Sequence, residues 1–217
     1  MNDNFKTDEV DGDAGLASPG QEPESDGVTA GDKARMELYD WLQCIVTAVI
    51  CGIFIFVFIG RVIGVDGTSM MKTLHHNDRV ILSNLFYEPK NGDVIIFRAP
   101  TDKFGDKPLV KRVIAVEGQT IDIDFSTGDV FVDNVLQHEP YINEPTNRRL
   151  DFSGPAVVPE GHVFVMGDNR NFSSDSRDAG VGMVDTRYIL GKVLMVVIPG
   201  ASQNDPRDWS RFGQVEH

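Results

Sequence analysis

The strongest constraint on the fold is a run of nineteen uncharged residues, Leu42 to Gly60, with the sequence LQCIVTAVICGIFIFVFIG. As an α-helix this run would be about 28 Å long, which is close to the thickness of the hydrocarbon core of a bilayer. Tyr39 and Trp41 stand at its start, and aromatic residues often mark the interface at the ends of membrane helices. We therefore expect one transmembrane helix over residues 41–61, in preference to a buried core helix.

A cleavable signal sequence is a poorer interpretation of the same run, because the run begins late and no small-x-small site follows it. The flanking charges leave the orientation of the helix open. Lys33 and Arg35 precede the run, and Arg61 and Lys72 follow it. The positive-inside rule thus favours neither side.

Residues 1–40 hold eleven acidic and three basic residues and show no hydrophobic periodicity. Such a segment cannot bury enough apolar area to offset the entropy lost on ordering, so we expect a disordered acidic tail. A solvated extension is the simpler interpretation of this tail, and a docking segment is the alternative. The formal net charge of −13 argues against nucleic acid as a partner, because a polyanion is bound by clustered Lys and Arg.

Both cysteines, Cys44 and Cys51, lie in the apolar run. Two cysteines cannot make a disulfide framework or a four-cysteine zinc site. The five histidines show no ligand spacing with Cys or carboxylates, so the sequence predicts neither a metal nor a cofactor. A segment without cysteine after the run suits a domain that folds outside the cell without disulfides.

Residues 62–200 are predicted to form a mainly antiparallel β domain, followed by a C-terminal tail over residues 201–217. Short runs rich in Val and Ile are separated by turn signals such as Asn91-Gly92 and Asp133-Asn134. The expected strands are Arg79–Leu82, Asp93–Phe97, Leu109–Val116, Asp129–Val132, His162–Met166 and Lys192–Ile198. Within this domain, residues 121–160 are expected to be an insertion that carries a hairpin, and no role is assigned to it.

A lysine and an arginine are adjacent in the run Leu109–Val116. Because side chains alternate along a strand, Lys111 and Arg112 would point to opposite faces. A desolvated lysine loses its proton more readily, and its neutral amine can act as a general base. From this run alone, an edge strand whose lysine reaches water is the simpler interpretation.

Residues 167–177 follow the apolar run His162–Met166 and include several charged residues, three serines and two asparagines. One interpretation is a solvated turn. The other is a buried polar network in which Asp168 or Asp175 pairs with Arg112 or Arg177.

Five short elements follow one another between roughly residues 40 and 200. They are G-x-S-M-x-x-T-L at Gly67–Leu74, Asp78-Arg79-Val80, Gly92–Arg98, Val110–Ile114 followed by Gly118, and G-D-N-R-x-x-S-x-D-S-R-x-x-G at Gly167–Gly180. In this order they resemble the bacterial type I signal peptidases, the Ser/Lys proteases that remove signal peptides from exported proteins. The last element is the most specific of the five.

The resemblance implies a mainly antiparallel, barrel-like β-sheet catalytic domain preceded by one N-terminal transmembrane helix. It also implies a membrane-bound serine endopeptidase that spans the cell membrane once, with its N-terminus in the cytoplasm and its catalytic domain on the outer face. The expected partners are preproteins that carry signal peptides, the lipid bilayer and the secretion machinery.

By this resemblance, Ser69 is the nucleophile and Lys111 the general base, and Ser173 hydrogen-bonds the lysine and fixes its direction. The backbone N–H of Ser69 would hold the oxyanion. The residues expected as structural ion pairs are Arg112, Asp168, Asp175 and Arg177. The residues expected to line the substrate pockets are Val65, Met70, Leu74, Leu109 and Val110, and plain core positions are the alternative for some of these five.

Two positions depart from the family pattern. Gly67 stands where some relatives carry a hydroxyl that adds an oxyanion donor, and no role is assigned to the neighbouring Thr68. Lys72 stands where the family usually has proline, which leaves the geometry of this turn in question.

Two other classes of protein remain as alternatives. The first is a membrane-tethered relative that binds signal peptides without cutting them, and its only support is Lys72. The second is a self-cleaving Ser/Lys regulator of similar β architecture. That class is typically soluble and linked to nucleic acid, whereas this sequence has an apolar anchor and an acidic tail.

Overall fold

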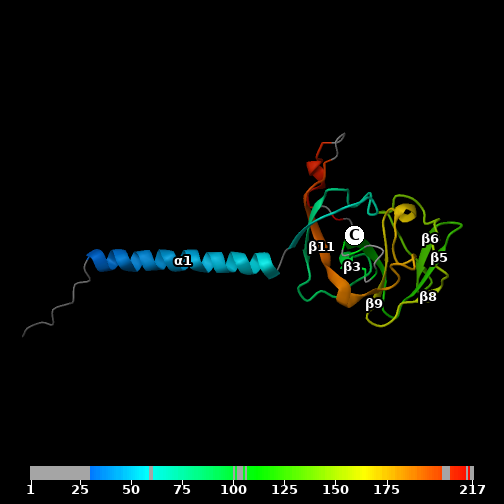
Figure 1. The fold of residues 1–217 in the computed structure, drawn as a ribbon, viewed down its shortest axis with the longest axis horizontal. Coiled ribbons are helices and arrows are strands. Elements are labelled where there is room, and N and C mark those ends of the chain that lie inside the picture. Colours follow the sequence, from blue (N-terminus) through cyan, green and yellow to red (C-terminus); the bar gives the residue numbers. More distant parts are fainter. Residues whose placement is uncertain are drawn as a thin grey trace, which may run out of the picture. The chain divides into compact units, whose positions relative to one another are not determined.

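A computed structural model describes residues 30–58, 61–99, 101, 105, 107–201, 206–213 and 215. The chain divides into two compact units, Met1–Ala48 and Val49–His217. The first unit contains most of helix α1, and the second contains the β domain that Figure 1 labels by its strands. Residues 1–29 of the expected acidic tail lie outside the described residues.

Helix α1 spans Ala30–Phe58. Its segment Gly31–Phe54 is long and apolar enough to cross a membrane, judged by length and composition. The helix begins at Ala30, earlier than the expected residue 41, so the structure differs from the disorder expected over residues 30–40. These residues are rich in good helix formers, and Asp32 in the first turn complements the positive end of the helix dipole. A helix already formed in the apolar run extends through such residues at low cost.

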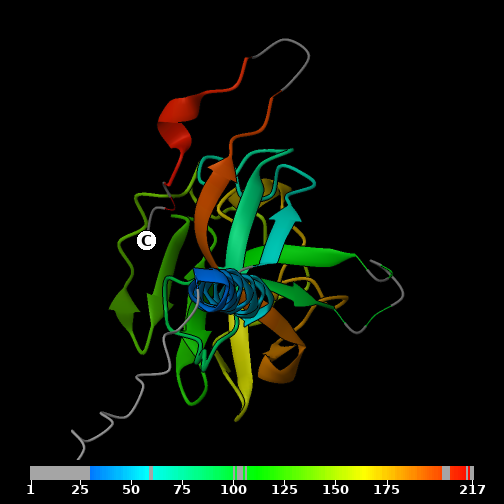
Figure 2. The ribbon, with the colours of Figure 1, turned by 90° about the vertical axis from the view of Figure 1, so that its left-hand side faces the viewer.

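The larger sheet of the β domain has seven strands in the order β1-β2-β11-β3-β4-β9-β10, and each neighbouring pair is antiparallel. In Figure 2, β1 (cyan), β2 (blue-green) and β11 (orange) lie side by side. The strands are β1 (Arg61–Gly64), β2 (Arg79–Ser83), β3 (Val94–Arg98), β4 (Pro108–Val116), β9 (His162–Met166), β10 (Val184–Asp185) and β11 (Ile189–Ile198).

The smaller sheet has four strands in the order β7-β6-β5-β8, again antiparallel. Its strands are β5 (Thr120–Asp124), β6 (Asp129–Val132), β7 (Val135–Leu136) and β8 (Ala156–Val157). The segment expected as an insertion therefore supplies a sheet of its own, and Figure 1 shows β5, β6 and β8 together at one end of the β domain.

The mainly antiparallel β fold expected from the sequence is confirmed, and strands form at all six expected runs. Sequence reasoning missed β1, β5, β7, β8 and β10. Three of these, β7, β8 and β10, have two residues each, which is too short for an alternating pattern to show.

Strand β3 explains how the core is arranged around the larger sheet. Its first four residues are all buried, because alternate side chains enter two different core clusters. Val94 and Ile96 pack in the cluster that contains Met70, whereas Ile95 and Phe97 pack in a second cluster. Strand β4 is hydrogen-bonded beside β3, so its middle residues also lie deep in the domain.

The C-terminal segment, expected only as a tail, contacts the β domain. The guanidinium group of Arg211 donates to both carboxylate oxygens of Asp78, at 3.0 and 2.6 Å, and Val215 is buried in the cluster that contains Met70. Burial by itself raises the pKa of Asp78, but the hydrogen bonds from Arg211 and from the Gly200 and His75 N–H groups outweigh it and hold the pKa below its ordinary value.

Arg211→Ala should lower the free energy of unfolding by about 2 kcal/mol, because a buried carboxylate loses a charged partner. The measurement is thermal or urea unfolding of the full chain in detergent, followed by circular dichroism. Arg187→Ala is the matched control, since the side chain of Arg187 is 83% exposed and an ion pair made by such an exposed arginine contributes little. Equal losses in the two variants would contradict a stabilising role for the Arg211 contact.

Candidate active site

A serine and a lysine far apart in the sequence meet in the β domain. Ser69 lies in the loop that joins β1 to β2, and Lys111 lies in the middle of β4. The Nζ atom of Lys111 is 2.7 Å from the Oγ atom of Ser69 and also donates to the Val110 carbonyl at 2.8 Å. The Lys111 side chain does not reach water as an edge-strand lysine would, because the residue is only 3% exposed.

The protonation of Lys111 follows from its burial. Desolvation lowers the pKa of its ammonium group to about 8, and the opposing charges of Asp175 and Asp168 limit the fall. Near pH 8, a large share of the molecules therefore carries a neutral amine in contact with a serine hydroxyl. This arrangement is the one that a general base and its nucleophile require.

The loop after β9 holds the backbone around Ser69. The backbone N–H of Asn169 donates to the Ser69 carbonyl at 3.0 Å, and the Nδ2 atom of Asn169 donates to the Thr68 carbonyl at 3.1 Å. Gly167 allows this close approach, because a Cβ atom there would lie 2.5 Å from the Ser69 carbonyl oxygen. Sequence reasoning gave Asn169 no role, although it stands in the most specific motif.

Ser173 is buried close to Gly167, but its hydroxyl has no hydrogen-bond partner among the residues that the structure describes. The hydrogen bonds of the Lys111 Nζ atom go to Ser69 and Val110 instead. The structure therefore differs from the expected contact between Ser173 and the lysine, and the orienting role of Ser173 stays a prediction.

The four residues expected as ion pairs form two buried pairs. Arg112 donates to both oxygens of Asp168 at 2.9 and 2.8 Å, and Arg177 donates to both oxygens of Asp175 at 2.9 and 2.8 Å. The side chains of both pairs are completely buried. The charged side chains of residues 167–177 thus form a polar network inside the domain and not a solvated turn. Bidentate pairing satisfies these charges and fixes the shape of the loop.

A third buried pair was missed. Arg170 donates from Nη1 and Nη2 to the carboxylate of Glu139, each at 2.7 Å, and from Nη1 to the Thr146 hydroxyl at 3.0 Å. Glu139 lies between β7 and β8, and Arg170 lies in the loop after β9 that is hydrogen-bonded to the backbone around Ser69. The pair therefore joins these two segments. Glu139 lies 31 positions before Arg170, and no local sequence pattern indicates such a contact.

A cavity of about 290 Å³ lies beside the serine and the lysine. Four of the five residues expected to line a substrate pocket do line this cavity: Val65, Met70, Leu109 and Val110. Leu74 does not. It is fully buried in the core cluster with Val80 and Val94, so it takes the core position that was the alternative. The sequence did not indicate three further apolar lining residues, Ile63, Ile96 and Pro108.

The Ser69 backbone N–H has no acceptor within the described part of the chain. It is therefore free to donate to an oxygen that appears beside Ser69 during a reaction. The N–H of Gly67 differs, because it donates to the Nδ1 atom of His76 at 3.1 Å.

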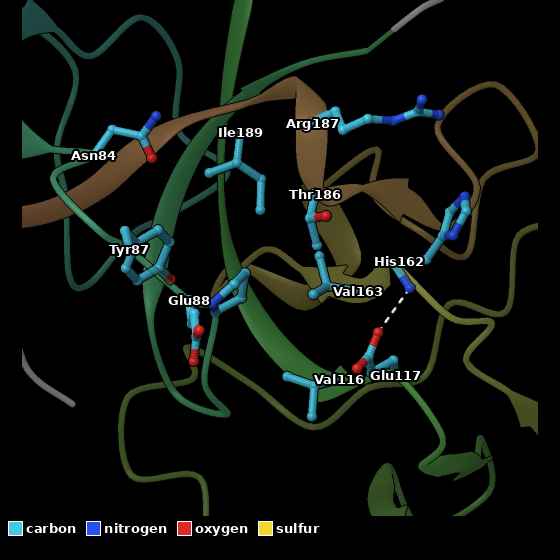
Figure 3. A pocket seen from close by; sticks show the side chains of 12 residues that line it. Asn84, Tyr87, Glu88, Val116, Glu117, His162, Val163, Thr186, Arg187 and Ile189 are labelled. Carbon is cyan, nitrogen blue, oxygen red and sulfur yellow. Dashed lines mark hydrogen bonds between the residues drawn. The ribbon is translucent and has the colours of Figure 1, made fainter.

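A second cavity, of about 550 Å³, is shown in Figure 3. Tyr87 and Glu88 stand on one side of it and Arg187 and His162 on the other. Its polar groups are largely engaged, since Tyr87 donates to Asp93, Arg187 pairs with Asp185, and Glu117 accepts from the Gly161 N–H (dashed line). Neither Ser69 nor Lys111 lines it, so we place the chemistry in the smaller cavity.

Within the described residues, no group of three or more His, Cys, Asp or Glu side chains could hold a metal ion.

Comparisons with known proteins agree on one family. Residues 38–198 match the family model described as signal peptidase, peptidase S26. The chain is 35% identical to signal peptidase I of Bacillus licheniformis, over 76% of this chain and 91% of that protein. It is 34% identical to signal peptidase I T of Bacillus subtilis (strain 168), over 79% of this chain and 90% of that protein. A solved signal peptidase I from Enterococcus faecalis is 28% identical, over 49% of this chain and 97% of that one, with a TM-score of 0.41.

Proposed function

The chain belongs to the signal peptidase family, peptidase S26, and from this premise we propose that it is a membrane-bound serine endopeptidase that cleaves N-terminal signal peptides from exported preproteins. Ser69 is the nucleophile and Lys111 the general base. The observation that carries the proposal is the 2.7 Å contact between the Lys111 amine and the Ser69 hydroxyl, made by a lysine whose burial lowers its pKa.

The first half of the reaction forms an acyl-enzyme. With Lys111 neutral, the Ser69 hydroxyl donates its hydrogen bond to the amine. Lys111 takes this proton as Ser69 Oγ attacks the scissile carbonyl carbon, and the Ser69 N–H donates to the resulting oxyanion. The Lys111 ammonium then gives the proton to the leaving amine, and the C–N bond breaks. The signal peptide stays on Ser69 as an ester, and the mature protein leaves.

The second half releases the signal peptide. A water molecule takes the place of the leaving amine, gives a proton to neutral Lys111 and attacks the ester carbonyl. Collapse of the second tetrahedral intermediate returns the proton to Ser69 Oγ and frees the carboxylic acid. One lysine thus serves both steps without a histidine and an aspartate.

The cavity beside the dyad suits the side chains that signal peptides place before the cut. From the family we expect small residues at the first and third positions before the scissile bond, and the largely apolar walls of the cavity of about 290 Å³ suit such side chains. Its lining comes from residues 63–70 on one side and 107–111 on the other, together with Ile96. A peptide bound between these two segments in an extended form would add hydrogen bonds along a strand edge.

Helix α1 supports a proposal for the place of action. We propose that α1 crosses the cell membrane once, with the N-terminus in the cytoplasm and the β domain on the outer face, where exported preproteins emerge. The secretion machinery is a candidate partner there. Protease treatment of intact cells should remove the β domain and spare the N-terminal segment, and the opposite pattern would contradict this orientation.

The test of the function is cleavage of a labelled preprotein by the full chain in detergent, with the new N-terminus read by sequencing. We expect one cut, after a small residue at the end of the signal peptide. A protein that binds the signal peptide but does not cut it over hours would support the non-catalytic alternative instead.

Activity should depend on pH through Lys111. Only the neutral amine accepts the serine proton, and burial lowers the pKa of Lys111 to about 8, so kcat/KM should rise from pH 6 to pH 9 with a midpoint near pH 8. The sign follows from the base: raising the pH removes the proton that blocks it. The measurement is the initial rate of peptide cleavage at low substrate concentration across this range. A flat profile, or a fall in rate, would contradict Lys111 as the base.

A further inference from the structure

Asn169 contacts the nucleophile segment from two of its atoms. Its backbone N–H donates to the Ser69 carbonyl at 3.0 Å, and its side-chain Nδ2 donates to the Thr68 carbonyl at 3.1 Å. Asn169 is only 7% exposed, and the buried arginine pairs on either side of it fix its loop. One residue therefore holds two successive peptide groups of the chain that carries Ser69.

The Thr68 contact determines where the Ser69 N–H points. The carbonyl of Thr68 and the N–H of Ser69 belong to one planar peptide group, and in a trans peptide they point in opposite directions. When Nδ2 holds the carbonyl on one edge of this plane, the N–H is fixed on the other edge. That N–H has no acceptor among the described residues, so it stays available to an oxyanion.

The oxygen of the Asn169 side chain also indicates a functional role for this residue. Its Oδ1 atom is buried without a hydrogen-bond partner in the described part of the chain. A buried oxygen without a hydrogen-bond partner destabilises a fold, and such groups are often retained at functional sites. Among the residues that the structure describes, the side chain of Asn169 makes one hydrogen bond, which is the bond to Thr68.

We propose that Asn169 is a positioning residue for catalysis, which orients the Ser69 N–H toward the oxyanion through its hydrogen bond to the Thr68 carbonyl. The proposal rests on the function given above. Asn169 touches neither the substrate nor the reacting atoms. We therefore expect Asn169 to stabilise the transition state, in which the oxyanion is charged, and to leave the binding of the uncut peptide unchanged.

The test is Asn169→Ala in the full chain in detergent. This variant removes the Nδ2 donor and keeps the backbone N–H that holds the Ser69 carbonyl. Asn171→Ala is the matched control, because Asn171 lies in the same loop and its side chain bonds to the backbone of residues 145, 147 and 148, not to the nucleophile segment.

Asn169→Ala should lower kcat by about 10- to 100-fold, because a misdirected oxyanion donor loses most of its effect, while KM stays within about threefold. The midpoint of the pH profile should not move, since the variant changes no charge near Lys111. Affinity for a peptide aldehyde, which forms a tetrahedral adduct with Ser69, should fall in proportion to kcat. Affinity for the matching peptide amide should not change. Asn171→Ala should match the unchanged protein in all five quantities.

Three outcomes would overturn the proposal: an Asn169→Ala variant as active as Asn171→Ala, a loss seen in KM instead of kcat, or a loss of folding by circular dichroism. The third outcome would give Asn169 a structural role. In each case the unchanged protein still cuts the preprotein, so the proposed function stands. Failure of the proposed function is a different result, in which the unchanged protein does not cut at all.

Discussion

Replacing Ser69 or Lys111 by alanine should reduce the rate of preprotein cleavage by on the order of 10⁴-fold or more. Ser69→Ala removes the oxygen that forms the ester, and Lys111→Ala removes the amine that lies 2.7 Å from that oxygen. Because the two groups act as a unit, the double variant should be no less active than either single variant. The measurement is the cleavage of a labelled preprotein by equal amounts of each folded variant.

Two substitutions of the same kind serve as controls. Ser126→Ala and Lys90→Ala remove an exposed serine and an exposed lysine outside the cavity beside the dyad, and both variants should cut at the normal rate. If Ser69→Ala or Lys111→Ala kept a rate near that of these controls, the assignment of nucleophile and base would be wrong.

The largest effect on stability is expected at Asp168. Asp168→Ala should lower the free energy of unfolding by about 3–5 kcal/mol, because Arg112 loses both of its bonds to Asp168 while its charge stays completely buried. The Thr73 hydroxyl loses an acceptor in the same variant. Urea unfolding of the full chain in detergent measures the change.

The control for this loss is Asp129→Ala, because Asp129 is exposed at the start of β6, and this variant should change the free energy of unfolding little. Asp168→Asn gives a second readout. The charge of Asp168 raises the pKa of Lys111, so removing that charge should move the midpoint of the pH profile to lower pH. An equal loss of stability in Asp168→Ala and Asp129→Ala, or a midpoint that moves to higher pH, would contradict the role given to Asp168.

The sequence predicted the strands that contain three or more consecutive apolar residues, and it missed those with shorter runs. Strand β3 is buried on both faces, and its continuous run of Val, Ile and Phe was visible without a structure. Strand β10 has two residues, and only its pairing with β9 makes it a strand. The start of α1 at Ala30 was missed for a related reason. Charged residues of good helix propensity fit a solvated tail and the exposed start of a helix equally well.

The candidate site was likewise predicted only in part from the sequence. The family resemblance of the motifs was enough to select Ser69 and Lys111 as the proposed dyad, and four of the five expected pocket residues line the cavity beside them. The spacing could not separate Leu74 from these four, because an apolar residue in a loop can line a cavity or fill the core. It also could not indicate which acid pairs with which arginine, since that depends on how the loop after β9 folds beneath β4.

The sequence by itself determined that an uncharged helix of membrane length precedes a β-rich domain, and that the motifs of one peptidase family lie in that domain in the family order. These properties are local, because each depends on residue types within a short stretch of chain. Only the tertiary structure decided the depth at which Lys111 is buried, the arginine pairs, the two contacts of Asn169 and the docking of Arg211 on Asp78. Each of these depends on residues far apart in the chain, and burial changes the pKa of an amine only after the fold has removed water from around it.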